Sequence, residues 1–453
     1  MHLDSPPRAP IAPSTREGWG SRLGFLLAAV GSAVGLGNMW RFPYRTSEGG
    51  GAAFVLLYIV MTLMIGLPLI TAEFVIGRRS KQSPIGAIVA AGGQRWRPLG
   101  YLFVLIGFTI LAYYSVITGW TLRYSVESLF TGFPSDTQGH FDAISTGHGA
   151  LGYHALAMAI AVAVVSGGVK GGIERASMIL MPVLFLLLAG LAIWAGGLKG
   201  GQAGYQFYLQ VDFRELLSLQ TLAAAAGQAF FSLSIGMGAM LTYASYLSGG
   251  ESLPGAAASI ATADFLVAFV AGLVVFPMIF AFGLEGQLGE SAIGALFIGL
   301  PKAFASMGGA GRVVGFMFFS TLAVGALTSG ISLLEVVTSS VIDMRAYSRR
   351  KAALLTGGVC LLVGVPSAYS GDVLAAMDHL AGNVLLVIGS LALSILVGWR
   401  LPDAVSEMAS GFHGPRKLLV GWLWTLRILV PFVLFFVLLQ TLSNAWSSVH
   451  SFF

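Results

Sequence analysis

The fold of this chain is indicated first by one segment, Gly31-Ser-Ala-Val-Gly-Leu-Gly-Asn-Met-Trp-Arg41. It lies inside the apolar segment 23–44, which is long enough to cross a membrane, yet it contains three glycines and Asn38. A glycine destabilises a helix by roughly 1 kcal/mol relative to alanine, and an asparagine brings a polar amide to membrane depth. Taken alone, the segment is either a close packing face of the Gly31-xxx-Gly35 kind or a helix broken to line a cavity.

The composition places the chain among integral membrane proteins. Of its 453 residues, 56% are hydrophobic and only 10% are charged, and the mean hydropathy is +0.82. Soluble domains carry about 25% charged residues. The single cysteine, Cys360, excludes a disulfide framework and a cysteine metal cluster. The first 15 residues are polar and rich in proline, which predicts a cytoplasmic tail over residues 1–20 and no cleaved signal.

Eleven apolar segments approach or exceed the length of about 20 residues that a transmembrane helix needs. They cover residues 21–44, 51–77, 98–126, 153–170, 175–196, 217–247, 255–284, 310–342, 352–368, 374–399 and 418–443. Lys and Arg concentrate in the connections that are cytoplasmic if the N-terminus is inside. This asymmetry and the odd number of spans predict a cytoplasmic N-terminus and an external C-terminus in the bacterial cytoplasmic (inner) membrane.

A second interrupted span contains Ile235-Gly-Met-Gly238, which is similar to Val34-Gly-Leu-Gly37 in the first. These are the sixth and first spans, so the second copy enters the membrane from the opposite side. This pattern predicts an all-α membrane protein with a 5+5 inverted repeat in which helices 1 and 6 are broken. The predicted repeats are residues 21–200 (helices 1–5) and 201–400 (helices 6–10), followed by a loop and helix 11 over 401–453.

Four acidic residues fall inside predicted spans, where a charge is costly and is therefore a candidate for function. Asp264 is the sharpest candidate because Ala, Phe, Leu and Val dominate around it, although a structural pairing with a buried donor stays open. The others are Glu73, Glu335 and Asp378. For Glu73, near the end of its helix, a structural role is expected.

Two broken helices that meet at mid-membrane would offer two kinds of backbone group. The positive N-terminal ends of half-helices attract an anion such as a carboxylate, and freed carbonyls are hard oxygen ligands for a small cation. Thr328 and Ser329 could add hydroxyl ligands or bond back to their own helix. Because the chain has no phosphate-binding loop, HExxH or GxSxG motif, an ion gradient is the expected energy source and an enzyme is not expected.

The chain resembles the neurotransmitter:sodium symporter family, specifically its eleven-helix bacterial amino-acid transporter branch, over nearly its whole length. The motifs that carry the resemblance are Trp19-Gly-Ser-Arg-Leu-Gly24, Gly31-Ser-Ala-Val-Gly-Leu-Gly-Asn-Met-Trp-Arg-Phe-Pro43, Glu48-Gly-Gly-Gly-Ala52, Gly227-Gln-Ala-Phe-Phe-Ser-Leu-Ser-Ile-Gly-Met-Gly238 and Leu327-Thr-Ser329. An inverted repeat is a described feature of this family, so the repeat pattern is not independent of the resemblance.

The resemblance implies two sodium sites, a substrate site and two gates. The first sodium site (Na1) would use Ala33, Asn38, Ser232 and Asp264 with the substrate carboxylate, and the second (Na2) would use Gly31, Val34, Gly325, Thr328 and Ser329. The substrate would contact Ala33, Gly35, Leu36, Gly37, Ile110, Tyr114, Phe231, Ser232, Ser234, Gly236, Met237, Ser329 and Leu333. The outer gate would be Arg41 with Asp378, and the inner latch would be Arg16 and Trp19 with Asp343.

Departures from the family pattern narrow the expected activity. Asp264 stands where many members have asparagine, and Ala268 stands where chloride-dependent animal members have serine. A fixed carboxylate would supply the negative charge of chloride, which predicts chloride-independent transport, with Asp264 a candidate for proton exchange on the return step.

Gly35 stands where monoamine carriers have aspartate, which favours a cargo that brings its own carboxylate. The apolar lining and the adaptable Met237, flanked by glycines that suggest room, favour a hydrophobic or aromatic side chain.

The leading hypothesis is therefore a sodium-coupled symporter of a hydrophobic or aromatic L-amino acid that works by alternating access. Two alternatives stay open: the same fold carrying an osmolyte or a modified amino acid, and a membrane receptor that binds an amino acid without moving it. The receptor is less favoured because no soluble segment is long enough for a signalling domain. The expected partners are a small-molecule amino acid, sodium ions and the lipid bilayer, and no nucleic acid.

Overall fold

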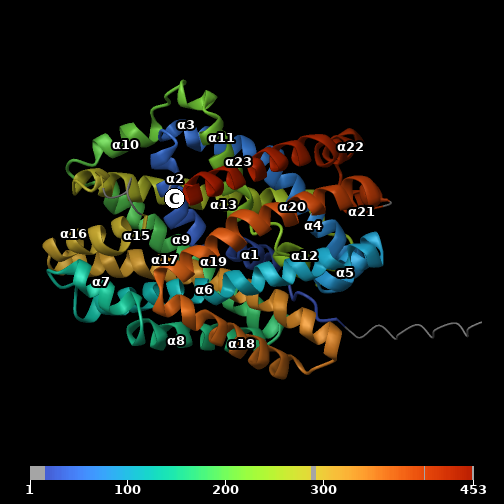
Figure 1. Ribbon diagram of the computed structural model, residues 1–453, viewed down its shortest axis with the longest axis horizontal. Coiled ribbons are helices and arrows are strands. Elements are labelled where there is room, and N and C mark those ends of the chain that lie inside the picture. The colour runs from blue at the N-terminus through green and yellow to red at the C-terminus, as the bar shows by residue number, and fades with distance from the viewer. Residues whose placement is uncertain (1–15, 287–291, 402, 451–453) are drawn as a thin grey trace, which may run out of the picture.

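The computed structural model describes residues 16–286, 292–401 and 403–450, so most of the predicted N-terminal tail lies outside the described residues. The described residues form an elongated bundle of helices without a strand, and a single isolated bridge joins Gly51 to Val211. The helices run roughly along the long axis of the bundle (Figure 1).

Nine helices within the described residues are long and apolar enough to cross a membrane. Four lie in the first half of the chain: Ala52–Ser80 (α3, Ala52–Met61; η2, Thr62–Gly66; α4, Leu67–Ser80), Gln94–Phe130 (η3, Gln94–Trp96; α6, Arg97–Phe130), His148–Ser166 (α8) and Val169–Gly196 (η4, Val169–Glu174; α9, Arg175–Gly196). Three in the second half are single helices: Leu253–Ala281 (α13), Gly309–Arg345 (α17) and Arg349–Tyr369 (α18). The last two contain π-helical turns: Gly371–Arg400 (α19, Gly371–Asp378; η7, His379–Leu385; α20, Leu386–Ile395; η8, Leu396–Arg400) and Arg416–Ser443 (α22, Arg416–Trp424; η9, Thr425–Leu429; and the start of α23, Val430–His450).

The first predicted span is a bent pair that makes a tenth candidate. It consists of α1 (Arg22–Ala33), followed after a short break by η1 (Gly37–Arg41) and α2 (Phe42–Glu48), with a bend of 48°. The sixth predicted span, 217–247, is present as two shorter helices, α11 (Leu219–Ser232) and α12 (Ala239–Ala244). The chain is therefore an all-helical integral membrane protein in which both predicted breaks are present.

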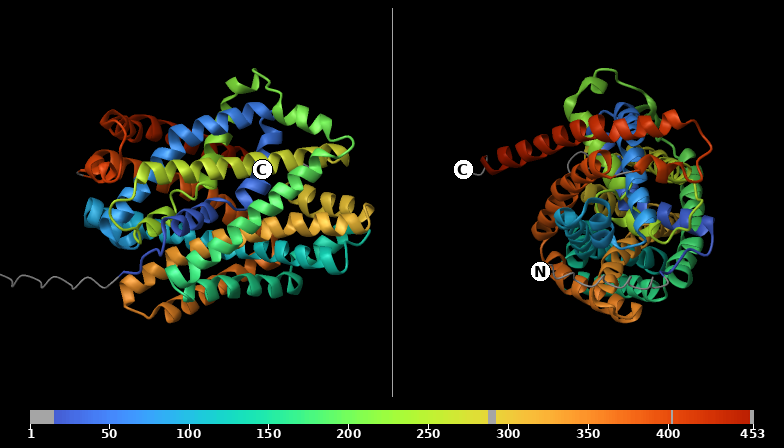
Figure 2. Two further views of the ribbon diagram at one scale, coloured as in Figure 1. Left: turned by 180° about the vertical axis from the view of Figure 1, so that it is seen from behind. Right: turned by 90° about the vertical axis from the view of Figure 1, so that its right-hand side faces the viewer.

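Several connections between the predicted spans contain short helices. At the end where the described chain begins lie α5 (Pro84–Gly92) and α21 (Ala404–Ala409), and at the opposite end lie α7 (Thr137–Ser145), α10 (Gln202–Leu209) and α16 (Leu300–Ser306) (Figure 1). We call these the N-terminal end and the opposite end. Figure 2 shows α23 at the periphery of the bundle, where it packs against α20 and α11.

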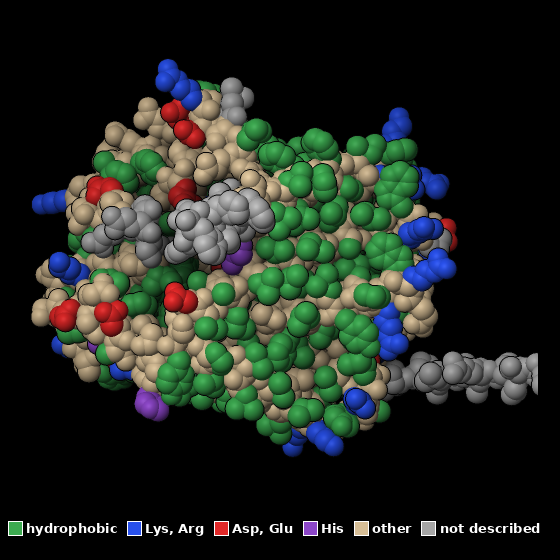
Figure 3. Space-filling view, in the orientation of Figure 1, with side chains coloured by type: hydrophobic (Ala, Val, Ile, Leu, Met, Phe, Trp, Pro, Cys, Tyr) green, Lys and Arg blue, Asp and Glu red, His purple; other side chains and the backbone are tan. Residues whose placement is uncertain are grey.

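The surface separates into an apolar middle and two polar ends. On the face in Figure 3, hydrophobic side chains cover the middle of the bundle, Lys and Arg gather at the N-terminal end, and most Asp and Glu lie at the opposite end. An apolar belt between polar ends is the surface expected of a protein surrounded by lipid.

Candidate functional site

The first helix breaks within the segment that the sequence singles out. α1 ends at Ala33, and Val34 is extended, with φ −74° and ψ 108°. The last carbonyl groups of an α-helix have no partner inside the helix, so those of α1 are free to meet other groups. A Cβ atom added at Gly35 would lie 2.6 Å from Ser329 Oγ and 2.8 Å from Tyr114 Oη. Glycine at position 35 therefore lets the break lie directly against α17 and α6.

The second break depends on left-handed backbone, which glycine adopts at little cost. The φ angle is +53° at Ser234, +80° at Gly236 and +76° at Gly238. Glu73 of α4 accepts hydrogen bonds from the backbone N–H groups of Gly236 at 2.8 Å and Leu241 at 2.9 Å. This buried carboxylate satisfies amides that the break leaves without helical partners, which is a structural role.

The glycines on either side of Met237 do not provide the extra room that the sequence suggests. A Cβ atom at Gly236 would lie 2.4 Å from Ser390 Oγ of α20, and one at Gly238 would lie 2.8 Å from Pro84 Cγ of α5. The two glycines instead allow neighbouring helices to approach the broken segment, so the expectation of space from them is wrong.

A fully buried carboxylate, that of Asp264 in α13, joins the two broken helices. Asn38 Nδ2 donates to Asp264 Oδ1 at 2.8 Å, and Ser232 Oγ lies 2.9 and 2.8 Å from the two carboxylate oxygens. Tyr58 Oη of α3 donates to Asp264 Oδ2 at 2.9 Å. The sequence did not indicate Tyr58, because a tyrosine in an apolar span carries no signal until its partner is known.

A second cluster of oxygen atoms lies where α1 ends against α17. Ser329 Oγ lies near three carbonyl oxygens, those of Gly31, Ser32 and Val34, at 3.4, 3.3 and 3.3 Å. Thr328 Oγ1 donates to the carbonyl oxygen of Gly325 in its own helix at 3.0 Å. A Cβ atom added at Gly31 would lie 3.1 Å from Thr328 Cβ, so the hydroxyl pair and the end of α1 are in close contact.

A cavity of about 340 Å³ opens beside the first break. Its lining comprises Leu36, Gly37, Trp40, Arg41, Tyr44, Arg45, Tyr113, Tyr114, Ile117, Phe231, Ile293, Leu374, Ala375, Asp378 and Asn383. Four of these are predicted substrate contacts, namely Leu36, Gly37, Tyr114 and Phe231. The remaining predicted contacts are buried and do not line it: Ala33, Gly35, Ile110, Ser232, Ser234, Gly236, Met237, Ser329 and Leu333.

The charges of the predicted outer gate face this cavity without forming an ion pair. Arg41 and Asp378 both line it, but none of their nitrogen and oxygen atoms come within 4.0 Å of each other. Arg41 Nη2 donates to Asn383 Oδ1 at 2.6 Å, and its guanidinium lies 4.4 Å from the ring centroid of Phe231. Asp378 Oδ1 accepts from Tyr113 Oη at 2.7 Å. The direct pair expected from the sequence is not formed in this structure, because each charge has a neutral partner.

The residues of the predicted inner latch meet at the N-terminal end. Arg16 Nη1 lies 3.0 Å from Asp343 of α17, and Arg16 Nη2 donates to Ser245 Oγ at 2.8 Å. Trp19 Nε1 donates to the carbonyl oxygen of Tyr243 in α12 at 2.9 Å. The segment before α1 is therefore tied to both α12 and α17.

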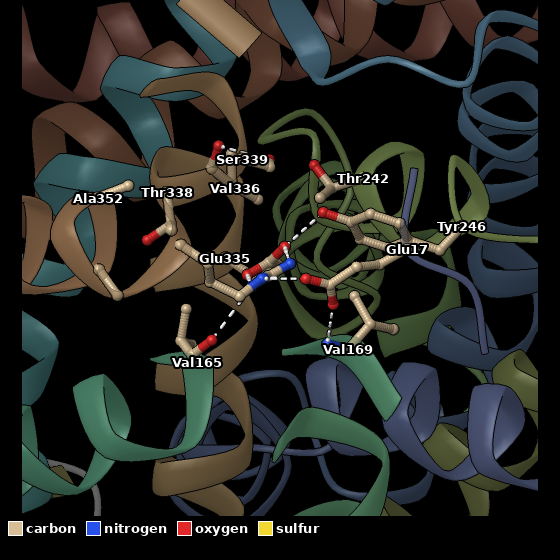
Figure 4. Close-up of polar contacts among 12 residues, drawn as sticks. Glu17, Val165, Val169, Thr242, Tyr246, Glu335, Val336, Thr338, Ser339 and Ala352 are labelled. Atoms are coloured by element: carbon tan, nitrogen blue, oxygen red, sulfur yellow. Dashed lines mark hydrogen bonds and ion pairs between the residues drawn. The ribbon is translucent and has the colours of Figure 1, made fainter. Parts of the chain in front are cut away.

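A larger network beside the latch closes the same end (Figure 4). The side chain of Glu335 is fully buried and pairs with both terminal nitrogens of Arg349, at 2.7 and 2.9 Å. Tyr246 Oη also donates to Glu335. Arg349 Nε lies 2.7 Å from Glu17, whose other oxygen accepts from the Val169 backbone N–H at 2.5 Å. The sequence pointed to Glu335 alone, since the other members of the network come from separate segments of the chain.

This geometry suits the binding of small hard cations. Within the described residues, no three or more His, Cys, Asp or Glu side chains come together in a group that could hold a metal ion. Carbonyl, hydroxyl and carboxylate oxygens of the kind in both clusters are the ligands that hard cations prefer. The cavity is lined by Leu36 and Gly37 of the first break and by the charged Arg41 and Asp378, while ion pairs join segments at the N-terminal end.

Comparison with known proteins shows the family of the chain. The model of the sodium:neurotransmitter symporter family matches residues 16–143 and 142–452. An uncharacterized sodium-dependent transporter of Bacillus subtilis (strain 168) is 33% identical over 445 residues, covering 93% of this chain and 97% of the relative. Another, from Methanocaldococcus jannaschii, is 34% identical over 459 residues, covering 96% and 92%.

A solved structure is similar over the whole fold. The crystal structure of MhsT in complex with L-phenylalanine matches with a TM-score of 0.85 and 38% sequence identity, covering 94% of this chain and 100% of that one. The family match, the similar relatives and this structure lead to one conclusion: the chain belongs to the sodium:neurotransmitter symporter family.

Proposed function

We propose that this protein is a sodium-coupled symporter of a hydrophobic or aromatic L-amino acid that works by alternating access and does not need chloride. The observation that carries the proposal is the pair of oxygen clusters flanking the first break, one of which contains the buried carboxylate of Asp264. Family membership supports sodium coupling, and the L-phenylalanine complex of MhsT, 38% identical, supports an amino-acid cargo.

Two sodium ions would bind in the two clusters. Na1 would be held by the carbonyl oxygen of Ala33 and the side chains of Asn38, Ser232 and Asp264 with the substrate carboxylate, and Na2 by carbonyl oxygens of Gly31, Val34 and Gly325 with the hydroxyls of Thr328 and Ser329. The convergence of these oxygens from both broken helices and from α13 and α17 supports this assignment. Sodium would thus stabilise the same broken segments that hold the substrate.

The substrate carboxylate would lie against the backbone N–H groups of Leu36 and Gly37 and the hydroxyl of Tyr114. The Leu36 N–H already donates to Tyr114 Oη at 3.1 Å, so these groups are close enough to share one carboxylate. The space next to Gly35 is filled by the hydroxyls of Ser329 and Tyr114, so an acidic side chain at this position would not fit without rearrangement. This favours a cargo that brings its own carboxylate.

We expect Gly35→Ala to weaken amino-acid binding about tenfold or more. The added methyl must displace the Ser329 or Tyr114 hydroxyl, and overpacking of this kind costs roughly 1–3 kcal/mol. Equilibrium binding of labelled L-phenylalanine to purified protein in sodium measures the loss. Gly227→Ala is the matched control, because a Cβ atom there meets nothing within 4 Å. Similar losses in both variants would contradict the role given to Gly35.

Replacing chloride by gluconate is expected to leave sodium-driven uptake unchanged. The Asp264 carboxylate accepts hydrogen bonds from Asn38, Ser232 and Tyr58, and Ala268 one turn later has no hydroxyl to add to an anion site. A resident carboxylate supplies the negative charge that chloride supplies elsewhere in the family. Uptake into proteoliposomes with sodium chloride or sodium gluconate on both sides is the measurement, and a large loss in gluconate would exclude chloride independence.

We further infer eleven transmembrane helices, with the broken pair α11 and α12 as the sixth, arranged as inverted halves over residues 21–200 and 201–400. The N-terminus would be cytoplasmic and the C-terminus outside, in the bacterial inner membrane. The gathering of Lys and Arg at the N-terminal end supports this orientation, because cytoplasmic ends of membrane proteins are enriched in these residues (Figure 3). Arg41 and Asp378 would then be the outer gate, and Arg16, Trp19 and Asp343 the inner latch.

Binding of labelled L-phenylalanine to the purified protein tests the proposed ligand. Binding should be strong in sodium and absent in potassium, and unlabelled hydrophobic and aromatic L-amino acids should compete better than an osmolyte such as betaine. Competition by betaine alone would instead favour the same fold with another cargo, and binding that is equal in sodium and potassium would contradict both sodium sites.

A further inference from the structure

Asn383, rather than Asp378, is the residue that engages Arg41 on the cavity wall. The hydrogen bond from Arg41 Nη2 to Asn383 Oδ1 is 2.6 Å long and joins the first broken helix to η7. Hydrogen bonds to charged groups are stronger than those between neutral ones. Asn383 Nδ2 lies 3.5 Å from His379 Nδ1, which leaves the amide oxygen directed at Arg41.

The π-helical geometry of η7 explains why Asn383 lies beside Asp378. In a π-helix the hydrogen bonds join residues five apart, so residues 378 and 383 stand about one turn apart, whereas in an α-helix the neighbours are three and four apart. Both residues line the cavity. A Cβ atom at Gly382 would lie 3.2 Å from Asp378 Oδ1 and 3.4 Å from the Phe231 ring, so the backbone of η7 lies close to both.

The two gate charges are each satisfied by a neutral partner while the cavity is open. Asp378 accepts from Tyr113, and Arg41 donates to Asn383. The other terminal nitrogen of Arg41, Nη1, is buried and has no hydrogen-bond partner among the described residues. An unpaired buried donor is costly, and the Asp378 carboxylate on the same cavity wall is a charged acceptor for it.

We propose that Asn383 is a positioning residue that keeps the outer gate open. Its amide holds the guanidinium of Arg41 away from Asp378, and closure transfers Arg41 from the neutral amide to the carboxylate. This inference rests on the proposed function, because it takes the cavity to be the outer entrance of a symporter. The open and closed states then differ by an exchange of one hydrogen bond for one ion pair, and position 383 sets the balance between them.

Thiol labelling of the cavity wall tests this role. The parent protein carries Cys360→Ala, which removes the single native cysteine, and Ile117→Cys, at a buried position that lines the cavity. Labelling by a charged thiol reagent is followed in sodium without amino acid. Asn383→Leu should slow labelling about tenfold, the size expected when one hydrogen bond to a charged group is lost. Asn383→Asp should speed it, because a carboxylate at position 383 holds Arg41 more strongly than the amide does.

Two further variants separate this role from a general disturbance of the helix. Adding Asp378→Asn to Asn383→Leu should restore labelling, since it removes the acceptor of the closed state. Gln220→Leu, which lines a neighbouring cavity without bonding to Arg41, should label like the parent. Any of three results would overturn the inference. They are labelling of Asn383→Leu at the parental rate, slower labelling in both single variants at position 383, and a double variant that still labels slowly.

Labelling and uptake fail in different ways. A parent protein without sodium-dependent uptake would refute the proposed function whatever its labelling rate. If the parent transports but the variants at position 383 label at the same rate as the parent, only the role of Asn383 is refuted.

Discussion

Asp264→Asn is expected to abolish sodium-driven uptake and to weaken sodium binding by on the order of 100-fold. The substitution keeps the shape of the side chain but removes the only carboxylate that the protein itself contributes to the proposed Na1 site. A unit charge about 4 Å from a cation contributes about 4 kcal/mol at an effective dielectric constant of 20, and part of this is offset by desolvation. Substrate binding should weaken in parallel, because its carboxylate would share the same ion.

The comparison variant for Asp264→Asn is Tyr58→Phe. It removes one of the three side-chain donors to the carboxylate but keeps the charge, so a loss of about tenfold or less in sodium affinity is expected. Sodium titrations of amino-acid binding measure both variants, and thermal melting in potassium shows whether each still folds. If Asp264→Asn kept the sodium dependence of the wild type, Na1 would not be where we place it.

Glu335→Ala is expected to open the N-terminal end and to reduce uptake to a small fraction of the wild-type rate. The carboxylate is fully buried and its partner Arg349 is only 13% exposed, so the change leaves a largely buried guanidinium without its main counter-charge. Breaking such a pair from one side costs roughly 3–5 kcal/mol, far more than an exposed ion pair. The change also removes the acceptor of Tyr246, which follows α12, and leaves Glu17 at the chain start as the remaining acidic partner of Arg349.

A double variant distinguishes the ion pair from the space its side chains fill. Glu335→Gln with Arg349→Gln removes both charges and should recover much of the uptake lost in Glu335→Ala. Glu127→Ala, which breaks the partly exposed pair with Arg123 at the opposite end, should have little effect. Uptake in proteoliposomes and labelling of cysteines placed at the N-terminal end measure these outcomes. Wild-type uptake in Glu335→Ala would refute the closing role of the network.

The three glycines and Asn38 of the first span left a packing face and a break both open, and the similar glycine pair Gly236 and Gly238 in the sixth span then favoured the break. The meeting of Asn38, Ser232 and Asp264 could be anticipated from the family resemblance, and the structure brings these side chains into hydrogen-bond contact. Tyr58 could not, since its position in an apolar helix is equally compatible with ordinary packing.

The cavity wall shows a different limit of prediction. Asp378 and Asn383 are five residues apart, and α-helical spacing would not place them on the same face; only the π-helical turn of η7 does. The expected direct pair between Arg41 and Asp378 is also absent here, because residue identity does not reveal which of two acceptors an arginine takes in a given state. Backbone irregularity and conformational state thus explain why the contact between Arg41 and Asn383 could not be predicted from the sequence.

Accumulation of labelled L-phenylalanine in proteoliposomes is the decisive measurement for sodium-coupled transport by this protein. With sodium outside and potassium inside, we expect uptake that rises above equilibration with the medium and that collapses when the sodium gradient is removed, with chloride absent throughout. Binding without accumulation, or accumulation that is the same with potassium on both sides, would contradict a sodium-coupled symporter.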